Sequence, residues 1–330
     1  MGSRRTRKPV KILSIDGGGI RGVIPAMVLA QIESLTGKPV SELFDLIAGT
    51  STGGVLALAL AKPGRTGSPY YSAGEMVLLY EREGRRIFHQ PALAKLLSIG
   101  NLVEEKYPSE GIEDVLEEYF GETRLKDALN DVLITSYETE RRLPFFFKSR
   151  NARTREGHDY PMKAVARATS AAPTYFEPLK LDADDLRDYY SLIDGGVYAN
   201  NPSLCGYVEA KTLYPGREDV VFVSLGTGEL TRPLRYDDAR DWGLAGWAKH
   251  ILNVVLDGVS STVDYQLRQL LPAHPDGVRR YWRFQVRLNE DNEAMDDARQ
   301  ENIRSLKLLA EGLIRDRSDD LKSLCEALTG

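Results

Sequence analysis

The segment DLIAGTSTGG, Asp45–Gly54, constrains the fold more than any other part of the chain. A short apolar run leads directly into Gly-Thr-Ser-Thr-Gly, which has the form G-x-S-x-G of a nucleophile elbow. In such an elbow a strand ends, a serine stands at the tip of a strained turn, and a helix begins behind it. Ser51 is the predicted tip. The elbow residues predicted around it are Gly49, Thr50, Thr52 and Gly53.

The same pattern also occurs where a serine simply lies in a glycine-rich loop, so other segments have to decide between the two interpretations. A second glycine-rich turn occurs in ILSIDGGGIRGVIP, Ile12–Pro25, between a predicted strand and a predicted helix. Backbone N–H groups at such a helix start converge on one point and favour an anion. The anion is either a dinucleotide phosphate or the oxyanion of a tetrahedral acyl intermediate.

The spacing G-x-G-x-x-G of the dinucleotide interpretation is formally matched by Gly17, Gly19 and Gly22. That interpretation also requires an acidic residue about 20 residues further on, at the end of a second strand. Asp45 precedes its strand instead, so the sequence favours an oxyanion hole.

A third turn, in YYSLIDGGVYANNP, places Asp194 after an apolar run and before the base-turn glycines Gly195 and Gly196. A serine nucleophile needs a base, which is usually histidine. None of the four histidines stands at a strand end beside a glycine turn; they are His89, His158, His250 and His274. An aspartate can take the proton directly if desolvation raises its pKa. The alternative interpretation of Asp194 is a turn or cap residue.

The segments GGGIRG, GTSTG and DGG, in this order and each after an apolar run, resemble the patatin-like phospholipase family. The resemblance extends through YETERRLPFFFKS, ARATSAAPTYFEP and VVFVSLGTG, and so covers roughly residues 10–230. It implies a lipid acyl hydrolase with a Ser–Asp dyad, in which Ser51 is the nucleophile and Asp194 the base. It also implies an oxyanion loop consisting of Gly17, Gly18, Gly19, Ile20, Arg21 and Gly22.

Two charged residues accompany the glycines. Asp16 is expected to hold the loop by accepting backbone hydrogen bonds, rather than to act as the base. Arg21 either meets a lipid phosphate or braces the loop. The sequence shows no Cys/His metal cluster, and the chemistry is expected to need no metal and no cofactor.

Apolar runs and helical patterns alternate along residues 10–230, which predicts a three-layer α/β/α sandwich with a largely parallel sheet. Strands are expected at residues 10–15, 44–48, 132–137, 145–148, 189–193 and 220–225. Helices are expected at residues 24–35, 55–61, 74–86, 112–120, 162–172 and 204–213.

The chain is divided into a basic N-terminal tail (1–9), a patatin-like catalytic domain (10–240) and a mainly helical C-terminal part (241–330) that packs on the same core. One strand-like segment, Tyr281–Arg287, interrupts the C-terminal part. It also carries apolar residues at helical spacing, which are expected to face the core. These residues are Ile251, Val254, Val255 and Leu256.

Composition indicates which partners and which cellular compartment to expect. The formal net charge of −5 does not point to a nucleic-acid polymer as partner. The apolar run after Ser51 is much shorter than the roughly 20 residues of a membrane span, and the basic start lacks a secretory signal. Two cysteines, Cys205 and Cys325, are compatible with a reducing compartment. We expect a cytoplasmic protein, peripheral to a membrane, whose substrate is a phospholipid or lysophospholipid.

Two further hypotheses remain beside a constitutive hydrolase. One is the same chemistry gated by a cyclic nucleotide in bacterial antiviral defence, with a homo-oligomer as the active form. The other is a phosphate- or nucleotide-binding module that uses only the glycine loop. The start MGSRRT matches an N-myristoylation pattern at Gly2, and equally a segment added in cloning.

Overall fold

The structure, a computed structural model, describes residues 8–89, 106–183, 188–275 and 277–330. The predictions for Gly2 and for most of the basic tail lie outside the described residues.

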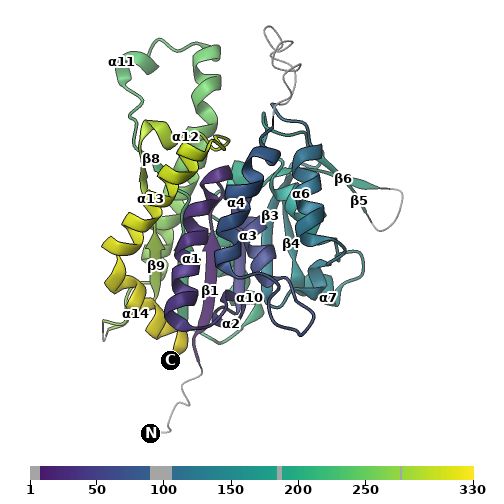
Figure 1. The fold of residues 1–330 in the computed structure, drawn as a ribbon, viewed down its shortest axis with the longest axis vertical. Helices are drawn as coiled ribbons and strands as arrows, with labels where there is room; N and C mark the ends of the chain where they lie inside the picture. Colours follow the sequence, from purple (N-terminus) through teal and green to yellow (C-terminus); the bar gives the residue numbers. More distant parts are fainter. Residues whose placement is uncertain (1–7, 90–105, 184–187, 276) are drawn as a thin grey trace.

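Among the described residues, an eight-stranded sheet organises the fold (Figure 1). Its strand order is β5-β6-β3-β2-β1-β7-β9, and β4 pairs with β3 beside this path. The five strands β1, β2, β3, β7 and β9 pair in parallel, whereas β4, β5 and β6 pair antiparallel. The strands are β1 (Val10–Ile15), β2 (Leu46–Thr50), β3 (Asp131–Glu138), β4 (Leu143–Lys148), β5 (Leu179–Asp182), β6 (Tyr189–Asp194), β7 (Val220–Leu225) and β9 (Tyr281–Phe284).

Helices cover both faces of the sheet, because successive side chains of a strand point to opposite faces and both sets are apolar. In β1, Leu13 packs into one buried cluster and Ile12 into the other. The first cluster lies under α1 (Val23–Thr36), α3 (Thr52–Ala61), α4 (Ala73–Ile87), α6 (Glu110–Phe120), α8 (Met162–Thr169), α13 (Gln300–Asp316) and α14 (Ser318–Thr329). The second lies under α10 (Ser203–Leu213) and α12 (Leu244–Leu270).

Shorter elements complete the described chain. A two-stranded parallel sheet joins β8 (Glu229–Leu230) to β10 (Arg287–Leu288). The short helices are α2 (Val40–Leu43), α7 (Ser149–Thr154), α9 (Gly196–Ala199) and α11 (Tyr236–Ala239), with 3-10 turns at Gly19–Gly22, Leu125–Asp127 and Glu290–Asn292.

The predicted three-layer α/β/α sandwich with a largely parallel sheet is confirmed. Strands β1 and β7 begin and end where the sequence predicts, and most other elements differ by one to three residues. The helix expected over 162–172 ends at Thr169. The strand-like segment 281–287 divides into β9 and β10. Strand β5 was not predicted, because its alternating exposed and half-buried residues lack an apolar run.

Residues after Asp241 contribute to the same sheet and layers. Strand β9 pairs with β7, and α13 lies against α1 (Figure 1). Residues 241–330 therefore extend the core instead of forming a separate one. The division of the chain at residue 241 stays a prediction.

The expectation that four apolar residues of α12 face the core was wrong for three of them. Ile251, Val254 and Val255 are 46%, 40% and 37% exposed, whereas Leu256 is half-buried. The reason is the length of α12: its first turns extend beyond the sheet, where no layer of described residues covers these side chains (Figure 1). Among the described residues, no helix is both long and apolar enough to cross a bilayer.

Candidate active site

Ser51 lies at the tip of a tight turn between β2 and α3. Its φ of 54° and ψ of −127° are unusual for a residue other than glycine, as a nucleophile elbow requires. The N–H of Ser51 donates to Thr169 Oγ1 at 2.8 Å, and the Thr169 hydroxyl donates to the carbonyl of Thr135 at 2.7 Å. This chain of hydrogen bonds fixes the strained turn to α8 and β3.

The small residues of the elbow allow α3 to start directly against β1. A Cβ at Gly53 would collide with the carbonyl oxygen of Ile15, so this position requires glycine. The two flanking threonines bond to other elements: Thr50 donates to the carbonyl of Ala199 at 2.6 Å, and the Thr52 hydroxyl pairs with that of Tyr80 at 2.6 Å.

Asp194 ends β6 and is 5% exposed. Its N–H donates to the carbonyl of Ala171 at 2.9 Å, and its Oδ1 accepts from the N–H of Gly196 at 2.7 Å. Ser51 and Asp194 line the same cavity, and the Ser51 hydroxyl lowers the pKa of the Asp194 carboxyl. The fold thus joins the serine and the aspartate that the sequence singled out, from turns 143 residues apart.

Burial raises the pKa of the Asp194 carboxyl to about 7, although the Ser51 hydroxyl and the hydrogen bond from the Gly196 N–H oppose the rise. A carboxyl with a pKa near neutrality is a much stronger base than an ordinary aspartate. Desolvation therefore supplies the basicity that a histidine would otherwise provide.

The glycine loop between β1 and α1 lies beside Ser51, since a Cβ at Gly17 would come within 3.2 Å of Ser51 Cβ. Several of its N–H groups are already used within the protein. Gly17 donates to Asn200 O at 2.9 Å, Ile20 to Met295 O at 2.8 Å, and Arg21 to Gly18 O at 3.2 Å.

No acceptor for the N–H groups of Gly18 and Gly19 occurs among the described residues, and both glycines line the same cavity as Ser51. Of the six loop residues predicted from the sequence, these two therefore combine a place in the cavity lining with an N–H group that has no described acceptor. Gly19 has a φ of 59° and would collide with the carbonyl of Met295 if it carried a Cβ. Gly22 packs against Tyr80 and Thr52 and does not itself line the cavity.

Arg21 braces the loop. Its side chain is 7% exposed and donates to Gly18 O at 3.3 Å and to Glu293 O at 3.4 Å. Of the two roles considered for this residue, these contacts support bracing.

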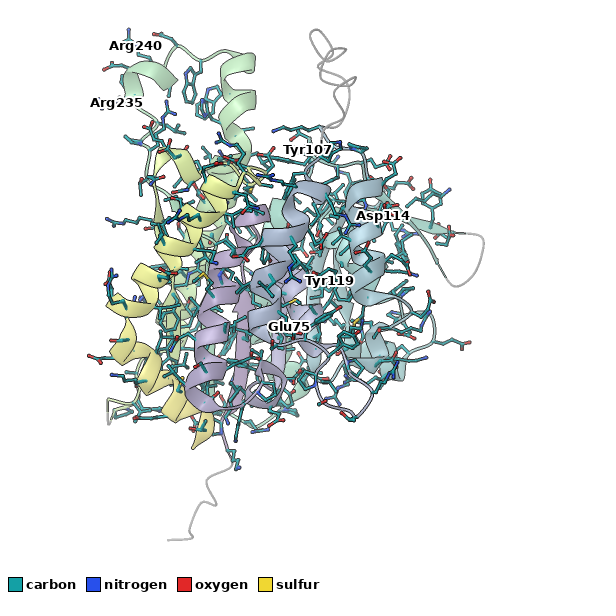
Figure 2. All side chains as sticks on the ribbon, viewed as in Figure 1. Glu75, Tyr107, Asp114, Tyr119, Arg235 and Arg240 are labelled. Carbon is teal, nitrogen blue, oxygen red and sulfur yellow. The ribbon has the colours of Figure 1, made fainter. Side chains whose placement is uncertain are left out.

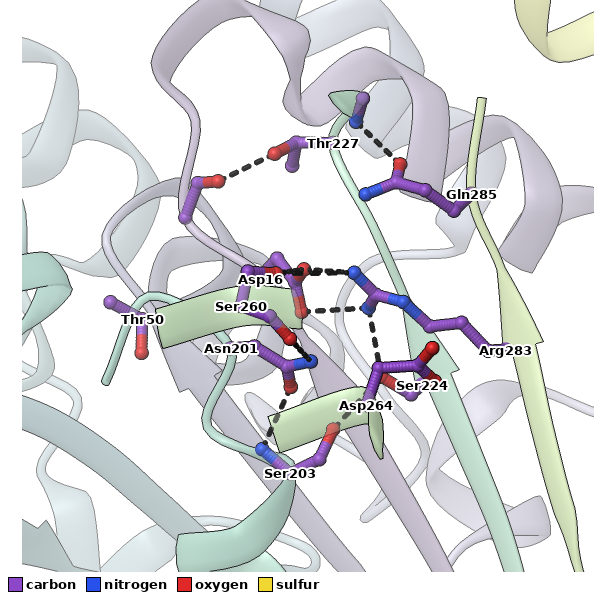
Figure 3. Close-up of polar contacts among 12 residues, drawn as sticks. Asp16, Thr50, Asn201, Ser203, Ser224, Thr227, Ser260, Asp264, Arg283 and Gln285 are labelled. Carbon is purple, nitrogen blue, oxygen red and sulfur yellow. Dashed lines mark hydrogen bonds and ion pairs between the residues drawn. The ribbon is translucent and has the colours of Figure 1, made fainter. Parts of the chain in front are cut away.

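Asp16 holds the loop differently from what the sequence predicted. Its carboxylate forms a bidentate ion pair with Arg283 of β9, with distances of 3.0 and 2.6 Å, and accepts from Ser260 of α12 at 3.2 Å (Figure 3). The predicted backbone hydrogen bonds to the Asp16 carboxylate do not form among the described residues. The expectation failed because the partner charge lies 267 residues away in the sequence.

Burial acts on both members of this ion pair. It raises the pKa of the Asp16 carboxyl, and Arg283 and Ser260 oppose that rise. Burial alone would lower the pKa of the Arg283 guanidinium, but the Asp16 carboxylate raises it above its ordinary value. Arg283 also donates to Ser224 of β7 at 2.9 Å, and Asn201 reaches the carbonyl of Ser260 at 3.3 Å (Figure 3). The glycine loop, two strands and α12 are thus tied to one buried polar cluster.

A cavity of about 110 Å³ opens beside the Ser51–Asp194 pair. Apolar side chains of α4, α6 and α12 line it, including Leu79, Leu116, Leu252 and Leu256, and Phe88 lines it directly after α4. A cavity with a polar pair at one end and an apolar wall accommodates a molecule with an acyl chain and one reactive polar group.

The four histidines lie in described segments and none lines this cavity. His158 and His274 contact Glu156 and Asp219, and His250 stacks on Trp242. In the described part of the chain, no group of three or more His, Cys, Asp or Glu residues is arranged to hold a metal ion.

Sequence reasoning missed Thr169 and Arg283. Thr169 lies in ARATSAAPTYFEP, a segment that the sequence analysis used only for its resemblance to the family. Arg283 interrupts the apolar segment YWRFQV, and an arginine in a buried strand requires a buried acid as partner. That signal was present, but it does not identify which acid.

The fold and the site define a class: an α/β protein with a serine at a strand–helix elbow, a buried carboxyl beside it and an apolar cavity. The family model described as patatin-like phospholipase matches residues 13–204. Patatin-like protein 4 of Arabidopsis thaliana is 32% identical over 92% of this chain and 83% of its own length. The protein named probable inactive patatin-3-Kuras 1, of Solanum tuberosum, is 31% identical over 93% and 86%.

The chain belongs to the patatin-like phospholipase family, and its function at the family level is lipid acyl hydrolysis. A solved structure, VipD from Legionella pneumophila, is also similar, covering 93% of this chain and 67% of that one. Its TM-score of 0.36 and identity of 12% are too low to support an argument.

The buried ion pair predicts the effect of Arg283→Met on stability. Removing the guanidinium leaves the Asp16 charge buried without a partner, so the free energy of unfolding should fall by about 3–5 kcal/mol. Adding Asp16→Asn should recover part of this loss. Denaturant unfolding of the two single variants and the double variant gives the coupling energy.

Arg287→Met is the matched control. Arg287 pairs with Glu229 at 3.3 Å but its side chain is 83% exposed, so its loss should change stability by less than about 0.5 kcal/mol. Equal effects of Arg283→Met and Arg287→Met would contradict the structural role assigned to the buried pair.

The raised pKa of Asp194 predicts a pH-dependent gain of stability in Asp194→Asn. The folded state holds the proton of Asp194 up to about pH 7, whereas the unfolded chain releases it near its ordinary value of 3.8. The stability of the wild type therefore decreases between these values relative to the variant, by about 4 kcal/mol.

Thermal unfolding of both proteins from pH 4 to pH 8 measures this difference. The stability advantage of Asp194→Asn should be small at pH 4 and largest at pH 8. A difference that stays constant across this range would show that Asp194 does not titrate with a raised pKa.

Proposed function

We propose that this protein hydrolyses fatty-acyl esters of phospholipids or lysophospholipids through a dyad of Ser51 and Asp194. The observation that carries the proposal is that Ser51, at its strained elbow, lines one apolar cavity together with a buried Asp194 whose pKa is raised to about 7. A carboxylate in this position accepts the serine proton without the help of a histidine.

In the first half of the reaction, Ser51 Oγ attacks the ester carbonyl carbon while its proton passes to Asp194. The carbonyl oxygen becomes negative and accepts hydrogen bonds from the N–H groups of Gly18 and Gly19. The intermediate then breaks its bond to the leaving alcohol, which takes the proton from Asp194. The acyl group remains on Ser51.

In the second half, Asp194 takes a proton from water, and the resulting hydroxide attacks the acyl-serine carbonyl. The new intermediate breaks its bond to Ser51 Oγ, which receives the proton back from Asp194. The products are a fatty acid and the free enzyme. Every proton is carried by Asp194, so the reaction needs no cofactor.

The apolar wall of the cavity supports an acyl ester as substrate. A phosphate- or nucleotide-binding module is less well supported, because a phosphate at the glycine loop would lie beside the Asp194 carboxyl and apolar side chains. Gating by a cyclic nucleotide and a role in antiviral defence stay predictions, since no contact among the described residues favours them. The name of the potato relative shows that family membership does not guarantee activity, so assays are needed.

The dyad predicts that Ser51→Ala and Asp194→Asn each lower kcat/KM for a soluble ester by about 10³-fold or more, and that the double variant loses little further. Residues that act as a unit give such non-additive losses. Hydrolysis of a short-chain p-nitrophenyl ester measures the effect, and circular dichroism checks that each variant is folded.

Ser170→Ala is the matched control, because Ser170 lines the same cavity and should tolerate the change within a few-fold. In the wild type, kcat/KM should rise with pH to a plateau with a midpoint near 7, since Asp194 must be deprotonated to act. A comparable loss on replacing any of the four histidines by alanine would indicate a Ser-His mechanism instead.

The oxyanion loop predicts that Gly18→Ala lowers kcat by about 10²-fold with a smaller change in KM. The added Cβ would collide with the side chain of Thr227, whose hydroxyl donates to Gly17 O at 2.5 Å, so the loop has to shift. Steady-state kinetics on the soluble ester separate the two constants.

Gly37→Ala is the control for a glycine replaced at a position of positive φ. Gly37 has a φ of 65° at the end of α1, and a Cβ there meets no atom within 4 Å. It should lower stability by about 1 kcal/mol and leave kcat unchanged. An unaltered kcat in Gly18→Ala would remove the loop from the mechanism.

A further inference from the structure

The first turns of α12 have two different environments. The helix begins at Leu244 and, together with α11, extends beyond the body at the end where β1 leads into the glycine loop (Figure 1). Four apolar side chains in these turns are exposed: Trp247 by 41%, Ile251 by 46%, Val254 by 40% and Val255 by 37%. We refer to these four residues as the α12 apolar face.

The four residues form one surface because of their spacing. Offsets of four, seven and eight from Trp247 place Ile251, Val254 and Val255 on the same side of a helix. Exposed apolar side chains that occur singly are ordinary, but a contiguous group on one helix marks an interaction surface.

The same turns also reach the candidate active site. Leu252 and Leu256 line the cavity that contains Ser51 and Asp194. The apolar wall of the cavity and the α12 apolar face are therefore neighbouring sides of a single helix. A molecule bound to that face lies next to the cavity.

The residues before α12 add charge and aromatic groups to this end of the molecule. Arg232 and Arg235 are exposed and form no ion pair among the described residues, whereas Arg240 pairs with Asp237 and Asp241. Tyr236 is 77% exposed. Figure 2 shows Arg235 and Arg240 on the segment that extends beyond the body.

We propose that the α12 apolar face docks on the surface of a lipid bilayer, with Arg232 and Arg235 contacting anionic headgroups. Exposed aliphatic and tryptophan side chains beside unpaired arginines are the composition of helices that lie in a membrane interface. The proposal rests on the proposed function, because the acyl ester that enters the cavity would come from the same bilayer.

Docking on a bilayer also explains why these side chains are exposed in the single chain. Inserted into the headgroup region, the face removes its apolar area from water, and the cavity beside it opens toward the acyl chains. A second copy of the chain is the competing occupant, and the experiment below separates the two.

The test is vesicle flotation with Ser51→Ala as the parent, so that no lipid is consumed. The vesicles contain equal parts of phosphatidylcholine and phosphatidylglycerol, and pure phosphatidylcholine vesicles serve as the neutral comparison. Ile251→Asp and Val254→Asp should each weaken partitioning by about tenfold, since each places a charge where an apolar side chain would enter the bilayer. Arg235→Gln should weaken binding to the anionic vesicles only.

Leu308→Asp is the matched control, because Leu308 is 58% exposed on α13 and lies outside the proposed face. It should leave partitioning unchanged. Ile251→Asp introduced into the active enzyme should retain hydrolysis of a soluble ester, because Ile251 does not line the cavity.

Equal flotation of the parent, Ile251→Asp and Val254→Asp would overturn the docking proposal. So would a parent that is dimeric in solution and becomes monomeric on Ile251→Asp with no change in flotation, since a second copy then covers the face. Failure of the wild type to hydrolyse any ester would instead contradict the proposed function, and flotation would still test the docking surface.

Discussion

The buried ion pair between Asp16 and Arg283 holds together the parts from which the site is built. Asp16 directly precedes the glycine loop, Arg283 lies on β9, and Ser260 of α12 bonds to the same carboxylate. Because an unpaired charge in this position would be costly, the pair makes the loop depend on residues 260–283. These residues lie beyond the matched family region, 13–204, so the C-terminal part supports a site whose reactive groups all lie before it.

A second constraint acts at Asp194. Burial raises the pKa of its carboxyl, and the same burial disfavours the charged form that a general base requires. The protein therefore loses stability at neutral pH through the group on which the proposed chemistry depends. The strained turn at Ser51, fixed by Thr169 and Thr135, is a further case in which local strain is maintained by surrounding hydrogen bonds.

Helix α12 connects these features with the exterior. One turn carries Ser260 to the Asp16 cluster, earlier turns carry Leu252 and Leu256 to the cavity, and the outermost side chains form the α12 apolar face. A bilayer that binds this face acts on a helix that already contacts both the cavity wall and the support of the glycine loop. One helix therefore lines the cavity and also supports the glycine loop.

Local sequence was sufficient for most strands of the sheet and for the two turns that hold Ser51 and Asp194. Apolar runs that end in glycine turns predicted the strands, the elbow at Ser51 and the turn at Asp194, because strand period and turn chemistry are properties of neighbouring residues. What the sequence did not determine depends on contacts between distant segments. The partner of Asp16, the role of Thr169, the two unused N–H groups of the loop and the exposure of Ile251 follow from how the layers pack. Periodicity shows that a helix has an apolar side, but only the tertiary structure decides whether another layer covers it.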